Sequence, residues 1–423
     1  MRSNQGLYLN FLYTLFVQSS NLLVPLILIP FLVKKAGMTG FAVLALAQSV
    51  MANISVFVDY GFSIVAVQEV VTNRSDNAKL GRIAGTVFVC KGLIAVACFL
   101  CLVAYLAFTG SHEWTVYLTS YLLVVAQAIS PFWFFQAVDN LKWISTVIAL
   151  GRILAFFLIL WFVPAFGLPE YVNAILGIGN LLASLYAFYQ MSHKYHVVPS
   201  LPSFAMIWAS YRSGWHLFTS TVATALYLQS SLLFIGFFSN ALWVGYYAAV
   251  EKIATILRQA LVVFSQVTFP KVCQIERTSK SEAILFYKHA FLPFLAAITV
   301  ACVVLFVGAP FLVHDLLKID APESVVILRI LSLVPAAVCV GIPYSHWVVL
   351  HYPKSKFNQI TWMTLLVFVL SSILLVPLFN GYGAAVAVLL AEISSVAMLV
   401  WLVEVSSKDS FLFRFIVDKM KVL

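Results

Sequence analysis

The chain has 423 residues, of which 62% are hydrophobic and only 10% are charged, and its mean hydropathy is +0.99. A soluble domain carries about 25% charged residues, so this composition excludes a water-soluble protein and predicts an integral membrane protein. The net charge of +9 comes from basic residues scattered along the predicted connections. They form no basic and aromatic patch of the kind that would predict nucleic-acid binding.

Twelve apolar stretches are long enough to cross a bilayer, which requires about 20 helical residues. We expect each to be a transmembrane helix, so the predicted fold is an all-α integral membrane protein. The first stretch has no small-residue cleavage site after it, and we interpret it as a retained span rather than a signal peptide. The predicted spans lie near residues 8–33, 41–67, 83–108, 115–137, 143–165, 168–190, 213–238, 243–269, 285–308, 325–349, 357–378 and 382–404.

The distribution of basic residues predicts the orientation of these spans, because cytoplasmic loops carry an excess of lysine and arginine. Five of the 25 basic residues lie within predicted spans, and three lie in predicted outside loops, namely Lys34, Lys35 and Lys318. The remaining 17, counting Lys288 in the first turn of the ninth predicted span, lie at positions that are cytoplasmic if the N-terminus is cytoplasmic. We therefore predict that both termini are cytoplasmic.

A polar stretch near the middle of the chain predicts a division into two halves. Residues 191–212 contain two prolines and several polar side chains, and we interpret them as a cytoplasmic linker. The predicted domains are residues 1–190 and 213–404, each with six helices, followed by a cytoplasmic tail at 405–423. The second span of each half opens on a glycine followed by an aromatic residue, at Gly40 and Gly245, which favours an internal repeat.

Charged and amide side chains within the predicted spans are the candidate functional residues, because a charge in the bilayer is costly unless it meets water, a partner or a substrate. The candidate substrate-binding cations are Lys91, Arg152, Lys252, Arg258 and Arg329. The candidates for a polar cavity or for ion coupling are Gln18, Asn21, Asp59, Glu251 and Glu392. The excess of cations over acids favours an anionic substrate.

Each of these residues also has a simpler structural interpretation. Gln18 and Asn21 can join neighbouring helices through hydrogen bonds, as uncharged polar residues in membranes often do. Asp59 and Glu392 can form ion pairs with a nearby cation. Lys91, Arg152 and Arg329 each lie nearer one end of a span and can extend their side chains to the membrane interface. Both interpretations stay open at this point.

Enzyme chemistry is not predicted for this chain. The eight histidines are dispersed, no cysteine has metal-type spacing with histidine, and no glycine-rich loop of the Walker type is present. We therefore expect no catalytic residues, no metal and no cofactor. If the charged residues within the spans line a transport pathway, we expect a proton or sodium gradient to drive it.

Several motifs together resemble bacterial polysaccharide flippases of the Wzx type, in the polysaccharide transporter branch of the superfamily that also contains multidrug extruders and lipid II flippases. They include Gln18-x-x-Asn21-x-x-x-Pro25, Asp59-Tyr-Gly-Phe62, Phe132-Trp-Phe-Phe-Gln136, Val244-Gly-Tyr-Tyr-Ala-Ala-Val-Glu-Lys252 and Gly381-Tyr-Gly-Ala384 leading to Glu392. The sequence departs from this family after Gln136, where a common glycine is missing and the acid follows at Asp139.

The resemblance implies two six-helix bundles around a central cavity in the bacterial inner membrane. It implies that the chain moves undecaprenyl-diphosphate-linked oligosaccharide, such as an O-antigen repeat unit, from the cytoplasmic to the periplasmic leaflet by alternating access. The cations within the spans would then contact the diphosphate or acidic sugars. A polysaccharide polymerase and a chain-length regulator are the expected protein partners.

Two alternative functions make different demands on the sequence. A multidrug extrusion antiporter of the same superfamily would be expected to have an acid-rich cavity, whereas cations dominate here. A polysaccharide polymerase or ligase would be expected to place catalytic residues in a large periplasmic loop. The largest predicted outside loop is near residues 309–324, which is too short for a folded domain.

Overall fold

The computed structural model describes residues 2–74, 76–110, 113–276 and 279–406, and within these ranges the side chains of residues 2–23 and of some scattered positions lie outside the description. All regular structure in the described residues is helical. This is the expected outcome in a bilayer, where a helix satisfies its backbone polar groups internally. The contacts divide the chain into two compact units, Met1–Ala225 and Leu226–Leu423.

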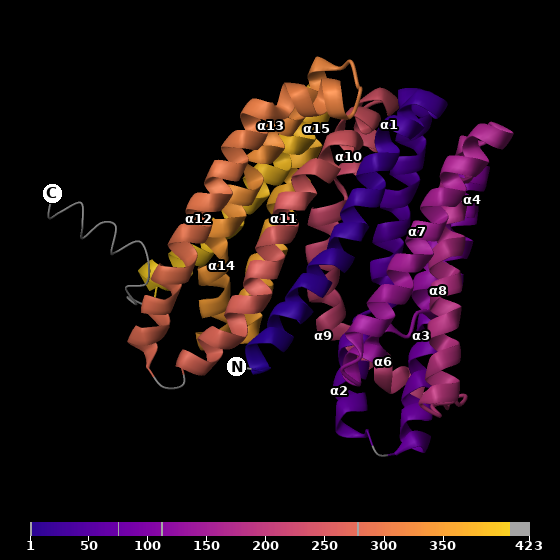
Figure 1. Ribbon diagram of the computed structural model, residues 1–423, viewed down its shortest axis with the longest axis vertical. Coiled ribbons are helices and arrows are strands. Elements are labelled where there is room, and N and C mark those ends of the chain that lie inside the picture. Colours follow the sequence, from indigo (N-terminus) through magenta and orange to yellow (C-terminus); the bar gives the residue numbers. More distant parts are fainter. Residues whose placement is uncertain (1, 75, 111–112, 277–278, 407–423) are drawn as a thin grey trace, which may run out of the picture. The chain divides into compact units, whose positions relative to one another are not determined.

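The first unit contains α1 to α8 and most of α9. Within it, α5 and α7 pack against α8, and α1 packs against α5 and α7 (Figure 1). The helices are α1 (Arg2–Asp59), α2 (Phe62–Thr72), α3 (Asn77–Thr109), α4 (Trp114–Ser120), α5 (Leu122–Ile129), α6 (Phe132–Ala137), α7 (Leu141–Phe166), η1 (Pro169–Tyr171), α8 (Val172–Lys194) and α9 (Phe204–Gln229).

The second unit contains the remaining helices. Within it, α14 packs along α15, and α11 lies beside α12 and α13 (Figure 1). The helices are α10 (Ser231–Phe238), α11 (Ala241–Glu276), α12 (Lys280–Phe311), η2 (Leu312–Leu316), α13 (Pro322–Ser332), α14 (Val334–His351), α15 (Lys354–Val400) and η3 (Trp401–Ser406).

Nine helices in the described residues are long and apolar enough to cross a membrane, or ten if the bent pair Thr221–Gln229 and Ser231–Phe238 forms one span. The chain is therefore a multi-pass membrane protein. The sequence predicted twelve spans, and the two counts differ chiefly because two predicted loops are single-residue breaks. Gly37 in α1 has φ 72° and ψ 172°, and Asn380 in α15 has φ 51° and ψ −129°. Glycine adopts such a positive φ without the steric cost of a Cβ atom.

The second predicted span is interrupted near its C-terminal end. Between α1 and α2, Tyr60 and Gly61 both have positive φ, at 47° and 76°. A second irregular turn follows α6, where Asp139 has φ 60°. This is the position at which the sequence carries an acid after the missing glycine, and aspartate is one of the few residues that adopt a left-handed conformation readily.

The helices carry apolar side chains on their outer faces, as expected in a lipid environment. On α7, Leu150, Leu154, Phe157 and Trp161 are exposed and recur at three- and four-residue intervals, whereas Ile159 on another face is fully buried. In water such a stripe would promote aggregation, but hydrocarbon solvates it. The buried face and the exposed face of this helix are therefore both apolar.

The connection between α8 and α9 is bound to the first unit. The Val197 N–H donates to the Met191 carbonyl at 3.2 Å, and the Ser200 N–H donates to the Gly81 carbonyl on α3 at 3.0 Å. The close approach depends on glycine, because a Cβ placed on Gly85 would lie 1.7 Å from the Ser200 carbonyl oxygen. The predicted linker 191–212 thus overlaps the ends of two helices, and its non-helical part is residues 195–203.

We expect Gly85→Ala to lower the stability of the protein by about 1–3 kcal/mol, the usual cost of an added group in a packed site. Thermal unfolding of the purified protein in detergent would measure the change. Gly92→Ala, on the same helix, is the matched control because a Cβ there meets no atom within 4 Å. Equal unfolding temperatures for the two variants would show that the connection does not need this close approach.

Candidate functional site

The first unit buries one ion pair at the break between α1 and α2. Lys91 on α3 is 1% exposed, and its Nζ lies 2.7 Å from Asp59 Oδ1 and 3.1 Å from Ser63 Oγ. The Ser63 hydroxyl donates to the same Asp59 oxygen at 2.5 Å. Since two partners already satisfy the Lys91 ammonium, this arrangement stabilises the charge without a substrate.

An aromatic cluster lies at the same break. Tyr60 stacks on Phe218 with ring centroids 4.2 Å apart, and on Phe62 at 5.1 Å. Tyr211 packs edge-on against Tyr60, and its hydroxyl donates to the Cys90 carbonyl on α3 at 3.0 Å. The positive φ of Tyr60 is therefore supported by packing on several sides.

The second unit has its own ion pair, between α11 and α15. Arg258 Nη2 lies 2.5 Å from Glu392 Oε1, and Glu392 is 6% exposed. Tyr227, near the end of α9, lies within electrostatic reach of both groups. A pair of this kind can exchange its arginine between the carboxylate and an incoming anion, because Arg forms charge-assisted hydrogen bonds with carboxylates and phosphates alike.

Three predicted site residues are less constrained. Among the described residues, none forms a hydrogen bond or ion pair with the side chains of Arg152 on α7 or of Glu251 and Lys252 on α11. All three side chains are half-buried. The Glu251 carboxyl lies within electrostatic reach of Lys252 and Arg258. These groups are available to bind an anion or, for Glu251, to take up a proton or cation.

The remaining predicted residues lie elsewhere or outside the description. Arg329 is in the last turn of α13, where its Nε donates to the Phe306 carbonyl at 3.4 Å and its guanidinium lies 5.4 Å from the Phe306 ring centroid. Gln18 and Asn21 are on α1, but their side chains lie outside the described residues. Within the described part of the chain, no cluster of three or more His, Cys, Asp or Glu is placed to hold a metal ion.

Sequence reasoning missed several polar contacts that the structure shows. Asp59 and Ser63 are four residues apart, but the break at Tyr60 and Gly61 separates them, so helical spacing did not predict their contact. No local signal could have paired Tyr227 with the Arg258–Glu392 pair. A third contact joins Gln48 to Asn173, with 2.7 Å from Nε2 to Oδ1, and Asn173 also donates to Ser120 Oγ at 2.9 Å. This last network joins α1, α4 and α8.

The fold is that of a class of membrane transport proteins with known structures. It is similar to a structure described as lipid II flippase MurJ in an inward closed conformation, with a TM-score of 0.72 and 15% identity, covering 94% of this chain and 87% of that one. It is also similar to an inward-facing multidrug resistance MATE family transporter, with a TM-score of 0.69 and 12% identity, covering 90% and 92%. At these identities the likeness establishes the fold alone.

The sequence comparison defines the family. Residues 7–276 match the family described as "Polysaccharide biosynthesis protein", and the chain belongs to this family. It is 27% identical over 387 residues to a protein of Escherichia coli (strain K12) named "Putative O-antigen transporter", covering 90% of this chain and 93% of that one. A Shigella dysenteriae protein of the same name is 21% identical over 388 residues, covering 91% and 96%. The predicted resemblance to the polysaccharide flippase family is confirmed.

We expect Lys91→Met to destabilise the first unit by about 3–5 kcal/mol, because it leaves the Asp59 carboxylate without its cation. The double variant Asp59→Asn with Lys91→Met should recover most of that loss. Thermal or denaturant unfolding in detergent would measure both. Lys79→Met is the matched control, since Lys79 is on the same helix and its ion pair with Asp76, at 3.6 Å, is exposed.

If the double variant were no more stable than Lys91→Met alone, the pair would not be the reason for the loss. If Lys79→Met were as costly as Lys91→Met, burial would not be the decisive difference between the two ion pairs.

Proposed function

We propose that the chain is a flippase that moves an undecaprenyl-diphosphate-linked oligosaccharide, such as an O-antigen repeat unit, from the cytoplasmic to the periplasmic leaflet of the bacterial inner membrane. The observation that carries this proposal is the match, over at least 90% of each chain, to two proteins named "Putative O-antigen transporter". A role in transport, with no catalysed reaction, agrees with the family. Alternating access, driven by a proton or sodium gradient, is the proposed mechanism.

Physical chemistry supports this assignment. A diphosphate with attached sugars cannot cross about 30 Å of hydrocarbon unaided, because no group there replaces its hydration. Cations within the helices can replace part of that hydration through charge-assisted hydrogen bonds, while the polyprenyl chain stays in lipid. A polysaccharide polymerase and a chain-length regulator are the proposed partners that use the product.

We also propose twelve spans in two six-helix bundles, residues 1–190 and 213–404, around a central cavity, with both termini cytoplasmic. The breaks at Gly37 and Asn380 support this count, because each divides one long helix into two, which raises ten spans to twelve. Topology reporters fused after residues 36 and 380 should give a periplasmic signal. A cytoplasmic signal at either position would contradict the proposed count.

Of the five candidate cations, we propose that Arg152 and Lys252 contact the diphosphate or acidic sugars first. Neither side chain forms a hydrogen bond or ion pair with a described residue, and this observation supports the proposed role. Arg258 would join them by exchanging Glu392 for the substrate. Lys91 and Arg329 would contribute only in a state that releases their present contacts with Asp59 and Phe306.

We expect Arg152→Gln and Lys252→Gln each to reduce transport by at least about tenfold, the effect of losing one charge-assisted contact. Surface polysaccharide in a complemented deletion strain, normalised to protein level, would measure it. Arg212→Gln and Lys318→Gln remove the same charges from exposed positions and should leave transport unchanged. Normal transport by well-expressed Arg152→Gln and Lys252→Gln proteins would remove both residues from the site.

Glu251 is the proposed coupling acid, because it is the one candidate acid with a described side chain that is not held in an ion pair. We expect Glu251→Gln to abolish gradient-driven transport without changing the protein level. The measurement is substrate movement in proteoliposomes with and without an imposed proton or sodium gradient. A Glu251→Gln protein that still responds to the gradient would leave Asp59 and Glu392 as the candidates.

The function itself is tested by deleting the gene in its native host and analysing surface polysaccharide together with lipid-linked intermediates. A flippase predicts loss of the surface polymer, with repeat units trapped on their carrier in the cytoplasmic leaflet. Single repeats at the surface would indicate a polymerase, and long polymer left on its carrier would indicate a ligase. Normal polysaccharide with new drug sensitivity would indicate a multidrug antiporter.

A further inference from the structure

The first unit contains a pocket of about 350 Å³ that the proposed transport function does not use. Such a volume is within the range of small-molecule sites. The pocket lies between α2, the first turns of α3 and the start of α9, at the end of the unit predicted to be cytoplasmic. Its lining residues are Phe62, Val65, Ala66, Glu69, Asn73, Lys79, Arg82, Ile83, Thr86, Val87, Met206, Ala209 and Ser210.

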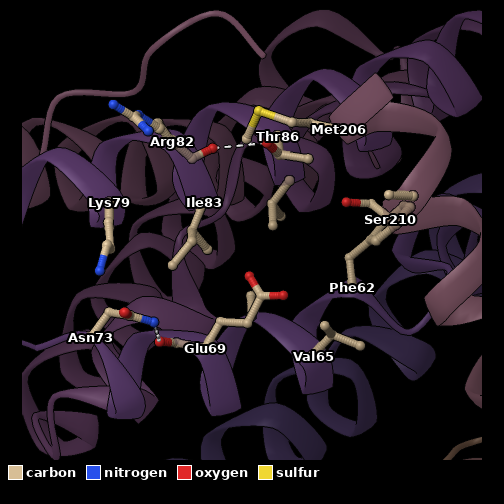
Figure 2. Close-up of a pocket in the computed structure, with 13 residues that line it drawn as sticks. Phe62, Val65, Glu69, Asn73, Lys79, Arg82, Ile83, Thr86, Met206 and Ser210 are labelled. Atoms are coloured by element: carbon tan, nitrogen blue, oxygen red, sulfur yellow. Dashed lines mark hydrogen bonds between the residues drawn. The ribbon is translucent and has the colours of Figure 1, made fainter. Parts of the chain in front are cut away.

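The charges of this pocket are placed on two walls. Glu69, on α2, directs its carboxylate into the pocket (Figure 2), and no hydrogen bond or ion pair to that carboxylate occurs among the described residues. The surrounding walls partly desolvate the Glu69 carboxyl and raise its pKa. Lys79 and Arg82 belong to the opposite wall, on α3, where the exposed pair with Asp76 leaves Lys79 free to turn toward a ligand.

The start of α9 closes the pocket. The exposed face of this segment indicates how deep in the membrane the pocket lies. Met206 and Ser210 of α9 line the pocket, whereas Phe204 and Trp208, on the opposite face of the same turns, are 81% and 65% exposed. Leu201, just before this helix, is 93% exposed. Large apolar and aromatic side chains in this position are typical of the membrane interface. In the proposed topology, the pocket therefore lies beside the lipid head groups of the cytoplasmic leaflet.

We propose that this pocket binds the head group of a zwitterionic aminophospholipid, with its ammonium on Glu69 and its phosphate on Lys79 and Arg82. A primary ammonium can donate hydrogen bonds to a carboxylate, whereas a quaternary ammonium has no N–H to donate. An anionic glycerol head group would satisfy the two cations but leave Glu69 facing an uncharged group. The apolar side chains of Phe62, Ile83 and Met206 suit the glycerol backbone and the first methylenes. This binding does not depend on the transport function.

The test is lipid binding to the purified full-length protein in detergent, measured by native mass spectrometry with phosphatidylethanolamine, phosphatidylcholine and phosphatidylglycerol. We expect phosphatidylethanolamine to bind about tenfold more tightly than the other two, as expected for one additional charge-assisted contact. Glu69→Gln should abolish this preference. Lys79→Gln should weaken the binding of phosphatidylethanolamine and phosphatidylglycerol alike, because both carry the phosphate.

Matched controls are Glu282→Gln and Lys356→Gln, which remove the same charges from exposed positions in the second unit and should change nothing. An unchanged unfolding temperature would show that Glu69→Gln is folded. Equal binding of the three lipids by the unmodified protein would overturn the proposal, and so would a preference that survives Glu69→Gln. Tightest binding of phosphatidylglycerol would also overturn it, since the pocket would then be a simple anion site.

Discussion

The cost of a charge in hydrocarbon is the constraint on which this structure depends. A bilayer interior offers no water to a lysine or glutamate, so the charge must meet a partner, a polar cavity or a substrate. Among the described residues, each unit satisfies this constraint with a buried or partly buried pair of a basic and an acidic side chain. Lys91 pairs with Asp59 in the first unit, and Arg258 pairs with Glu392 in the second. Each pair joins two helices that are far apart in sequence, so the charges also contribute to the specificity of helix packing.

The groups that have no such partner among the described residues then become informative. Arg152, Glu251 and Lys252 are half-buried on helices built mainly from apolar residues, where a charge without a partner is costly. A related fold serves both a lipid II flippase and multidrug transporters, so architecture alone does not select the substrate. The sign and position of these charges distinguish a site for anions from a site for cations.

The sequence was sufficient for the properties that depend on local composition. The apolar runs gave the membrane embedding and the positions of most helices, and the isolated charges identified the residues that need an explanation. Pairing was not predictable, because Arg258 and Glu392 are 134 residues apart and no periodicity relates them. The three pieces of the fourth predicted span, α4, α5 and α6, were also missed, since hydropathy does not report a turn between equally apolar helices. The pocket beside Glu69 was missed because its walls come from distant segments.

The connection after α8 has a further consequence for how the chain can be divided. Residues 197–200 are bonded to α8 and α3 and cover Gly81 and Gly85 at backbone distance. They are therefore part of the first unit's folded structure, although the sequence presents them as a spacer. A gene split within this segment would expose two helix glycines whose packing partner resides on the other fragment. The boundary between the two compact units accordingly lies after Ala225, farther along the chain than the two prolines of this stretch suggest.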